Sequence, residues 1–374
     1  MLVTGIAVLS AVSTECCAEM IDVWIGTSRA KPSKGIYHCT LNTETGRLSN
    51  TELAAEISGP GFLAMHPKLD VLYAVGTLDG KPCVAAYRIE AAGNSSTLIF
   101  VNSAEIGDGG SAHLAVDRTG KMLLTAQYGG GSVAAFLLNH DGSLNKQTQI
   151  VEHQGGSKVV ERRQESPHPH WCGFSPDNRF AFVPDLGLDK VVIYRVDAAT
   201  ASIERHGAAE TPPGGGPRHM KFHTSGKWVY VLNELALSVS VFDYDEASGT
   251  MTRKQTINTV PPELLAKEKF KSASEIRVHP SGRFVYSANR GHDTITAFGV
   301  NQTTGELEVI ERENVRGATP RNFNLDPSGR WLLAAGQDSH TLASFEVDQE
   351  TGELTYNRSV VTAPAAICVL FTHE

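Results

Sequence analysis

The sequence lacks the features that mark disulfide-stabilised, membrane-spanning or nucleic-acid-binding proteins. Its six cysteines are scattered, apart from the neighbours Cys16 and Cys17, and no Cys-x-x-Cys pair occurs, which indicates small buried side chains in a reducing compartment. The formal net charge is −8, whereas nucleic-acid-binding domains carry a basic surface. Beyond the first residues, no apolar run is long enough to span a membrane. We therefore expect neither a nucleic-acid partner nor a membrane partner.

Residues 1–19 leave two interpretations open. Leu2–Val12 is apolar and uncharged, and small residues follow it, as in a signal peptide cleaved after Ala18. A basic start is missing, because the first basic residue is Arg29, so the alternative is a miscalled start with Met20 as the first residue. In either case, residues 20–374 are expected to form a single domain. A chain that starts at Met20 would be cytoplasmic, and a cleaved one would be exported or periplasmic.

A repeat of about fifty residues runs through most of the chain. Its anchor is clearest in His223-Thr-Ser-Gly-Lys-Trp, His279-Pro-Ser-Gly-Arg-Phe and Asp326-Pro-Ser-Gly-Arg-Trp; looser copies begin at His66, Asp117 and Ser175. Each copy predicts a short strand, a turn rich in Pro, Ser and Gly, and a second strand, with a third and a fourth strand after them. Four short antiparallel strands per repeat are typical of a β-propeller blade.

The two ends of the chain supply a further blade. The six anchors predict six blades, while Ala365–Phe371 is predicted to be an innermost strand without following partners. The three strands predicted in Val23–Gly26, Gly35–Leu41 and Leu53–Ile57 lack an innermost strand. Joining the ends completes a blade and removes an exposed sheet edge. The predicted fold is an all-β, seven-bladed β-propeller with four antiparallel strands per blade, and Pro262–Phe270 is expected to be a helical insertion.

Ionisable side chains recur at equivalent positions of this repeat. Because the strands of a blade are antiparallel, the start of the first strand and the end of the second lie at the same mouth of the central channel. Charged groups are costly to bury, so a cluster of them at one mouth indicates a functional site. Any single member has a structural hydrogen bond as its alternative explanation. The residues at this mouth are His113, His170, Arg218, His219, Glu234, Glu275, Arg290, Arg321, Asn322 and Gln337.

Two other kinds of site are disfavoured. His168-Pro-His170 together with His113 and His219 has the composition of a metal site, but no carboxylate lies at a ligand-like spacing and Arg218 would repel a cation. We therefore predict no metal and no cofactor. The chain also has no Gly-x-Ser-x-Gly turn, which argues against a serine hydrolase.

Five segments carry a resemblance to a known family: Arg163-Gln-Glu-Ser-Pro-His168-Pro-His170, Gly215-Gly-Pro-Arg218-His219, Asn233-Glu234-Leu, Ser274-Glu275-Ile-Arg-Val-His-Pro and Ser287-Ala-Asn-Arg290-Gly. From about Met20 onward, the chain resembles the lactonase family of seven-bladed β-propellers. This family includes propeller-type 6-phosphogluconolactonases and the related carboxy-cis,cis-muconate lactonizing enzymes. Thr27-Ser28-Arg29 stands where Thr-Tyr-Thr is more usual, which leaves the substrate open.

The resemblance implies roles for individual residues. The family's proposed catalytic residues correspond to His170, Arg218, Glu234 and Arg290. We expect substrate binding by a larger group, which consists of His113, Gln164, His168, His219, Glu275, Arg321, Asn322 and Gln337.

The implied activity is metal-independent hydrolysis of 6-phosphogluconolactone to 6-phosphogluconate, a step of the pentose phosphate pathway in carbohydrate metabolism. Either Glu234 or His170 would activate water, while Arg218 and Arg290 would hold the oxyanion and the anionic part of the substrate. One alternative is a carboxymuconate cycloisomerase-type lactonizing enzyme that uses the same groups. Another is a non-catalytic binding scaffold, which predicts an apolar mouth. The expected partner is a small anionic lactone, and the expected state is a monomer or weak homodimer.

Overall fold

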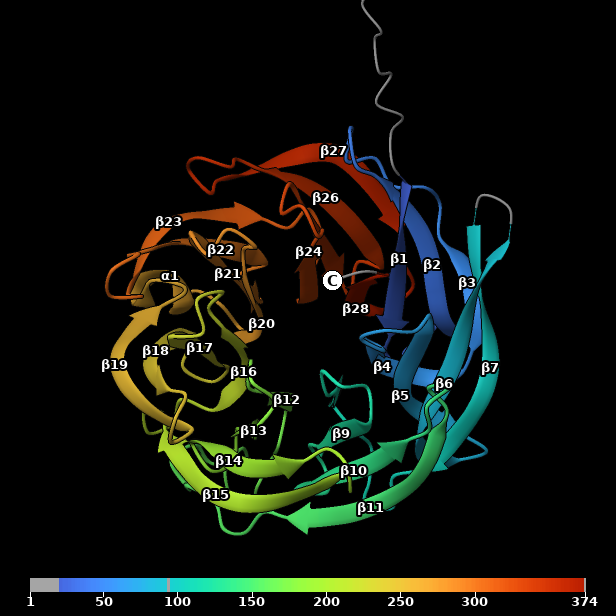
Figure 1. Ribbon diagram of the computed structural model, residues 1–374. Coiled ribbons are helices and arrows are strands. Elements are labelled where there is room, and N and C mark those ends of the chain that lie inside the picture. Colours follow the sequence, from blue (N-terminus) through green and yellow to red (C-terminus); the bar gives the residue numbers. More distant parts are fainter. Residues whose placement is uncertain (1–19, 93–94, 373–374) are drawn as a thin grey trace, which may run out of the picture.

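Seven four-stranded antiparallel sheets surround a central channel in the computed structural model, which describes residues 20–92 and 95–372 (Figure 1). The innermost strand of each sheet lines the channel and the other three follow outward. The first three sheets are β4–β7 (Ser58–Met65, Val71–Leu78, Lys81–Ala92, Ser95–Glu105), β8–β11 (His113–Val116, Met122–Gln127, Ser132–Leu138, Leu144–Glu152) and β12–β15 (Gly173–Phe174, Phe180–Asp185, Lys190–Asp197, Ser202–Glu210). The next three are β16–β19 (Pro217–Phe222, Trp228–Asn233, Ser238–Asp245, Thr250–Asn258), β20–β23 (Ser272–Val278, Phe284–Arg290, Thr294–Val300, Leu307–Asn314) and β24–β27 (Pro320–Leu325, Trp331–Gly336, Thr341–Val347, Leu354–Thr362).

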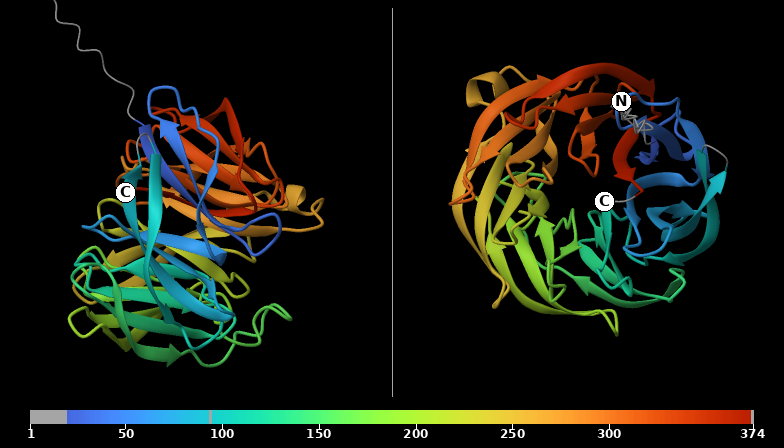
Figure 2. Two further views of the ribbon diagram at one scale, coloured as in Figure 1. Left: turned by 90° about the vertical axis from the view of Figure 1, so that its right-hand side faces the viewer. Right: turned by 45° about the horizontal axis from the view of Figure 1, so that its top comes forward.

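The seventh sheet joins the two ends of the chain, as predicted. Its order is β28 (Ala366–Phe371), β1 (Met20–Thr27), β2 (Gly35–Asn42) and β3 (Glu52–Glu56). The first two strands pair antiparallel, with Val23 opposite Phe371 and Ile25 opposite Val369. Figure 2 shows the red β28 beside the blue β1. The prediction of a seven-bladed propeller is therefore confirmed, and closure leaves no unpaired innermost strand in the described ring.

Neighbouring sheets are joined by apolar packing and by repeated polar contacts. The anchor histidine of one repeat reaches the anchor turn of the next: His223 accepts a hydrogen bond from the Ser225 amide at Nδ1 and donates from Nε2 to the Gly282 carbonyl at 2.8 Å. His279 does the same toward Gly329 at 3.0 Å. These bonds satisfy both ring nitrogens of each buried imidazole, which gives the anchor histidines a structural role between neighbouring sheets.

The one helix among the described residues is shorter than predicted. Only α1 (Pro262–Leu265) is α-helical, whereas the sequence predicted a helix up to Phe270. The segment turns after Ala266 because the chain must return to the channel, where β20 begins at Ser272. In the described residues, no helix has the length and apolarity needed to cross a bilayer. Residues 1–19, on which the two N-terminal interpretations depend, lie outside the described part.

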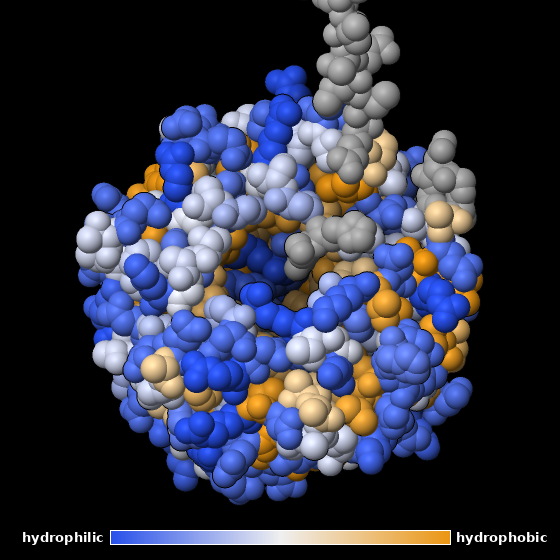
Figure 3. All heavy atoms as spheres, in the orientation of Figure 1, coloured by the Kyte–Doolittle hydropathy of each residue, from blue (hydrophilic) through white to orange (hydrophobic). Residues whose placement is uncertain are grey.

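The centre of the ring is hollowed, and hydrophilic residues together with apolar ones border the opening that Figure 3 shows. Polar side chains at such a place come from several sheets at once, because every innermost strand contributes to the channel wall. Residues that are far apart in the sequence therefore meet there.

Candidate functional site

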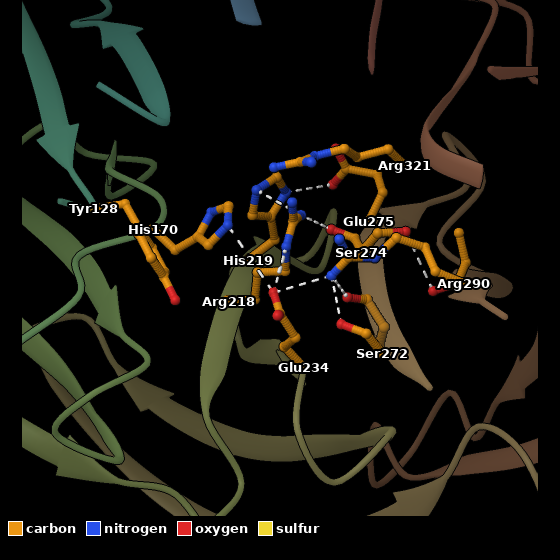
Figure 4. A network of polar contacts seen from close by, with 12 residues as sticks. Tyr128, His170, Arg218, His219, Glu234, Ser272, Ser274, Glu275, Arg290 and Arg321 are labelled. Carbon is orange, nitrogen blue, oxygen red and sulfur yellow. Dashed lines mark hydrogen bonds and ion pairs between the residues drawn. The ribbon is translucent and has the colours of Figure 1, made fainter. Parts of the chain in front are cut away.

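The innermost strands β16, β20 and β24 each begin with a β-bulge. The pairing of β16 with β17 shifts between Pro217 and His219, and the pairing of β24 with β25 shifts between Pro320 and Asn322. A similar shift in β20 spans Ser274 and Glu275. A bulge inserts an unpaired residue and re-aims its side chain. As a result, neighbours such as Arg218 and His219 both reach one buried polar network (Figure 4).

The loop before Arg218 is held by a carboxylate from the preceding sheet. Asp189 accepts hydrogen bonds from the Gly214 amide at 2.7 Å and from the Gly216 amide at 2.8 Å. Gly216 has φ of +64°, and a Cβ there would lie 2.5 Å from Leu235 Cγ. Only glycine fits this turn without strain, so the loop delivers Arg218 to the channel in a fixed position.

Glu234, directly after β17, is the centre of the site. Its Oε2 lies 2.9 Å from Arg218 Nε and 3.2 Å from Arg290 Nη2. Its Oε1 accepts a hydrogen bond from Arg163 Nη2 at 2.8 Å. Burial by itself would raise the pKa of Glu234, but the charges of Arg290 and Arg218 outweigh it and hold the pKa well below its usual range. Glu234 is therefore ionised and already bound on both oxygens.

The two buried arginines of this cluster have different surroundings. Arg218 also donates from Nη1 to the Ser274 carbonyl and lies 3.1 Å from His219 Nε2. Burial lowers the pKa of Arg218 to about 9, with a further contribution from the charge of Arg290. Arg290 donates from Nη2 to Ser272 Oγ at 2.5 Å and borders the pocket described below. Arg218 does not line that pocket and contacts Glu234 from behind it.

His170 faces Glu234 without a direct hydrogen bond. Its Nε2 lies 4.0 Å from Glu234 Oε2, and its Nδ1 has no hydrogen-bond partner among the described residues. Burial, together with the charge of Arg218, lowers the pKa of His170 well below its usual value, so the imidazole is neutral at physiological pH. The Tyr128 ring meets that of His170 edge-on at 5.3 Å. His170 is thus a neutral group with spare hydrogen-bonding capacity beside an ionised carboxylate.

Behind this cluster lies a second row of polar groups. His219 donates from Nδ1 to Glu275 Oε1 at 2.9 Å, so its Nε2 is free to accept a hydrogen bond from Arg218. Asn322 donates from Nδ2 to the other oxygen of Glu275. These residues fix the orientation of Arg218, since hydrogen bonds from His219, Asn322 and the Ile276 amide hold the Glu275 carboxylate in place.

Arg29, Arg163, Arg290 and Arg321 line a pocket of about 610 Å³ together with a single carboxylate, that of Glu234. This volume suits a small metabolite. Tyr128, His170, Phe270 and Ser272 also contribute to its wall. Among the described residues, no group of three or more His, Cys, Asp or Glu is placed to hold a metal ion. Four guanidinium groups against one carboxylate make the pocket suitable for an anion.

The structure brings the residues predicted from the sequence together to different degrees. Those that line the pocket are His170, Glu234, Arg290 and Arg321; those that support it from behind are Arg218, His219, Glu275, Asn322 and Gln337. Gln164 donates to Asp189 and to the Leu186 carbonyl, and so braces the loops. His168 stacks on Tyr128 at 4.5 Å. His113 lies in a separate hollow of about 320 Å³ beside Phe62.

Several wall residues were absent from the sequence prediction. Tyr128 follows its anchor by the same interval as Glu234 and Arg290 follow theirs, a signal that could have found it. Arg163 begins one of the five family-like segments but lies in a long loop with no position in the repeat. Arg29 and Phe270 also lie in connections between strands, where the repeat makes no prediction.

Comparisons with known proteins agree with this fold. A family profile described as "Lactonase, 7-bladed beta-propeller" matches residues 22–371. A 6-phosphogluconolactonase from Bacillus subtilis strain 168 is 37% identical over 351 residues, which cover 94% of this chain and 98% of the relative. A 6-phosphogluconolactonase from Formosa agariphila is 32% identical over 303 residues, 79% of this chain and 83% of the relative. The structure of a periplasmic gluconolactonase from Pseudomonas aeruginosa superposes with a TM-score of 0.86 at 29% identity, over 94% of this chain and 99% of that chain.

Proposed function

The chain belongs to the lactonase family of seven-bladed β-propellers, and we propose that it hydrolyses 6-phosphogluconolactone to 6-phosphogluconate. The observation that carries the proposal is the pairing of neutral His170 with ionised Glu234 in a pocket lined by four arginines. The names of the relatives from Bacillus subtilis and Formosa agariphila support the phosphorylated substrate. Because that substrate is made inside cells, a cytoplasmic location accompanies the proposal, as does a monomeric or weakly dimeric state.

The attacking water would sit between His170 and Glu234. The 4.0 Å separation of His170 Nε2 and Glu234 Oε2 is too long for a direct hydrogen bond, and both residues line the pocket. A water in contact with both atoms would be oriented for attack. His170 is the better general base, because the three guanidinium contacts make the Glu234 carboxylate a poor proton acceptor. Glu234 would instead stabilise the imidazolium that forms.

Hydrolysis then proceeds by addition and ring opening. Water adds to the lactone carbonyl carbon as His170 takes its proton, and the carbonyl oxygen becomes an oxyanion. Arg290 lines the pocket beside Glu234 and is the group placed to stabilise that charge. When the ester C–O bond breaks, His170 returns the proton to the ring oxygen, which leaves as the hydroxyl of the open acid. Arg218 acts by holding Glu234 in place.

The test is the rate of hydrolysis of freshly generated 6-phosphogluconolactone, compared with glucono-lactone, in the presence of a chelator. We expect rapid turnover of the phosphorylated lactone that the chelator does not reduce. A chain that hydrolyses neither lactone would contradict the proposal. Ring closure of a carboxymuconate by that same sample would identify a lactonizing enzyme, and inactivity toward all three substrates would leave a binding scaffold.

A further inference from the structure

Two of the arginines in the pocket lack a carboxylate partner. Arg163 and Arg290 both contact Glu234, but Arg29 and Arg321 make no ion pair within residues 20–92 and 95–372. Arg29 donates from Nη2 to Thr77 Oγ1 at 2.5 Å, and Arg321 donates from Nη1 to Gln337 Oε1 at 3.3 Å. Both partners are neutral, so two positive charges in this pocket remain uncompensated in a chain whose net charge is −8.

These two arginines enter the pocket from one side. Arg29 follows β1 and Arg321 lies at the bulge of β24, and the sheets that contain these strands are neighbours in the ring. His170 and Glu234 come from the β12–β15 and β16–β19 sheets instead. Arg321 lies beside the network around Glu234 (Figure 4), while Arg29 is exposed at the rim. Arg29 and Arg321 therefore border the pocket from two neighbouring sheets, whereas the Glu234 carboxylate enters it from another sheet of the ring.

The backbone also makes room for the outer arginine. A Cβ built on Gly59 would lie 2.5 Å from Arg29 Cγ, so the aliphatic stem of Arg29 passes directly over this glycine. Gly59 has φ of +59°, a conformation that favours glycine. Together with the Thr77 contact, this packing directs the Arg29 guanidinium along the pocket wall. An arginine held at both its stem and its head loses less rotational freedom when it binds an anion.

We propose that Arg29 and Arg321 form a subsite for the phosphate group of the substrate, separate from the groups that act on the lactone carbonyl. The inference rests on the proposed function and assigns different arginines to the oxyanion and to the phosphate group. Arg290 serves the oxyanion, and the pair Arg29 and Arg321 binds the phosphate dianion at the far end of the sugar. Arginine is suited to this role because its planar fork donates two parallel hydrogen bonds to phosphate oxygens.

The experiment compares kcat/KM for 6-phosphogluconolactone and for glucono-lactone in Arg29→Gln, Arg321→Gln and the double variant. We expect KM for the phosphorylated lactone to rise about 10- to 100-fold in the double variant, as for the loss of charge-assisted hydrogen bonds. The preference for the phosphorylated substrate should fall by at least 10-fold, and inorganic phosphate should inhibit the double variant more weakly than the wild type. Arg118→Gln is the matched control, since Arg118 is exposed outside the pocket.

Equal losses toward both lactones, or an unchanged preference, would overturn the subsite. Failure of the proposed function itself looks different, because the wild-type protein would then turn over neither lactone. In that case, calorimetric titration with 6-phosphogluconate tests the subsite without catalysis. Binding that the double variant loses supports the subsite, and binding that is absent from the wild type or equal in both proteins refutes it.

Discussion

Replacing Glu234 by Gln isolates the electrostatic role of this residue. The substitution keeps the size and one oxygen but removes the negative charge between Arg163, Arg218 and Arg290. The Arg218 and Arg290 side chains are 3% and 8% exposed and would be left close together without a counter-charge. The Arg163 side chain is 38% exposed, so solvent screens its charge and reduces its contribution to the loss of stability. Removing one partner from a buried ion pair costs about 3–5 kcal/mol, and we expect a loss of unfolding free energy in that range.

The assay is urea unfolding at pH 7, followed by tryptophan fluorescence, for Glu234→Gln, Arg290→Gln and the double variant. Because the second substitution removes one of the uncompensated charges, the double variant should be no less stable than Glu234→Gln, with a coupling energy of about 2 kcal/mol or more. Glu105→Gln serves as control, since that carboxylate pairs with Lys81 at the surface and the unfolding midpoint should hardly move. A loss below about 1 kcal/mol in Glu234→Gln, or purely additive effects, would refute the reasoning.

Three further outcomes are expected. His170→Asn should lower kcat by about 10²- to 10⁴-fold with a smaller change in KM. The wild-type rate should fall at acid pH as His170 becomes protonated, and the midpoint of this fall should lie below pH 6.5 because burial lowers the pKa of His170. The unfolding free energy should fall as the pH drops below 6.5, because the unfolded chain binds protons that the buried imidazoles of the folded protein exclude. The loss is up to about 1.4 kcal/mol per pH unit for each histidine that stays neutral when folded. The histidines with a lowered pKa are His66, His113, His170, His219 and His279. Gly216→Ala should destabilise the protein by about 1–3 kcal/mol, because its φ is +64° and the new Cβ would meet Leu235.

Each of these expectations has a clear contrary result. Full turnover by His170→Asn would move the general base elsewhere in the pocket. A urea midpoint that is constant between pH 7.5 and 5.5 would mean that the buried imidazoles bind protons as readily in the folded protein as in the unfolded chain. Wild-type stability in Gly216→Ala would show that the loop before Arg218 tolerates a side chain; Gly207→Ala, where a Cβ meets nothing within 4 Å, is the matched comparison.

The fold could be predicted in detail because the repeat constrains it strongly. A turn such as Pro280-Ser-Gly282 between two short apolar strands is a local signal, and its regular recurrence excludes most other architectures. The split blade followed from the same logic, since Ala366–Phe371 needed partners that only the N-terminal strands could supply. The helix prediction failed because local propensity extends to Phe270, whereas the chain must turn earlier to enter β20.

The site could be predicted in position but not in arrangement. Counting from the anchors placed Glu234 and Arg290 at one mouth, and both line the pocket. The same counting could not separate Arg290, which borders the pocket, from Arg218, which lies behind Glu234. It also could not place Arg29, because connections between strands have no position in the repeat.

The sequence by itself determined the ring of blades and the mouth of the channel at which the polar residues gather. Strand alternation and a regular repeat are local properties, and a closed ring is the arrangement that leaves no blade unpaired. Only the tertiary structure decided which groups face a ligand. Bulges turn side chains such as Arg321 away from the direction that simple alternation predicts, and Glu234 neutralises arginines from three other parts of the chain. Orientation and charge balance depend on contacts between residues that are distant in sequence, and these contacts exist only once the ring has closed.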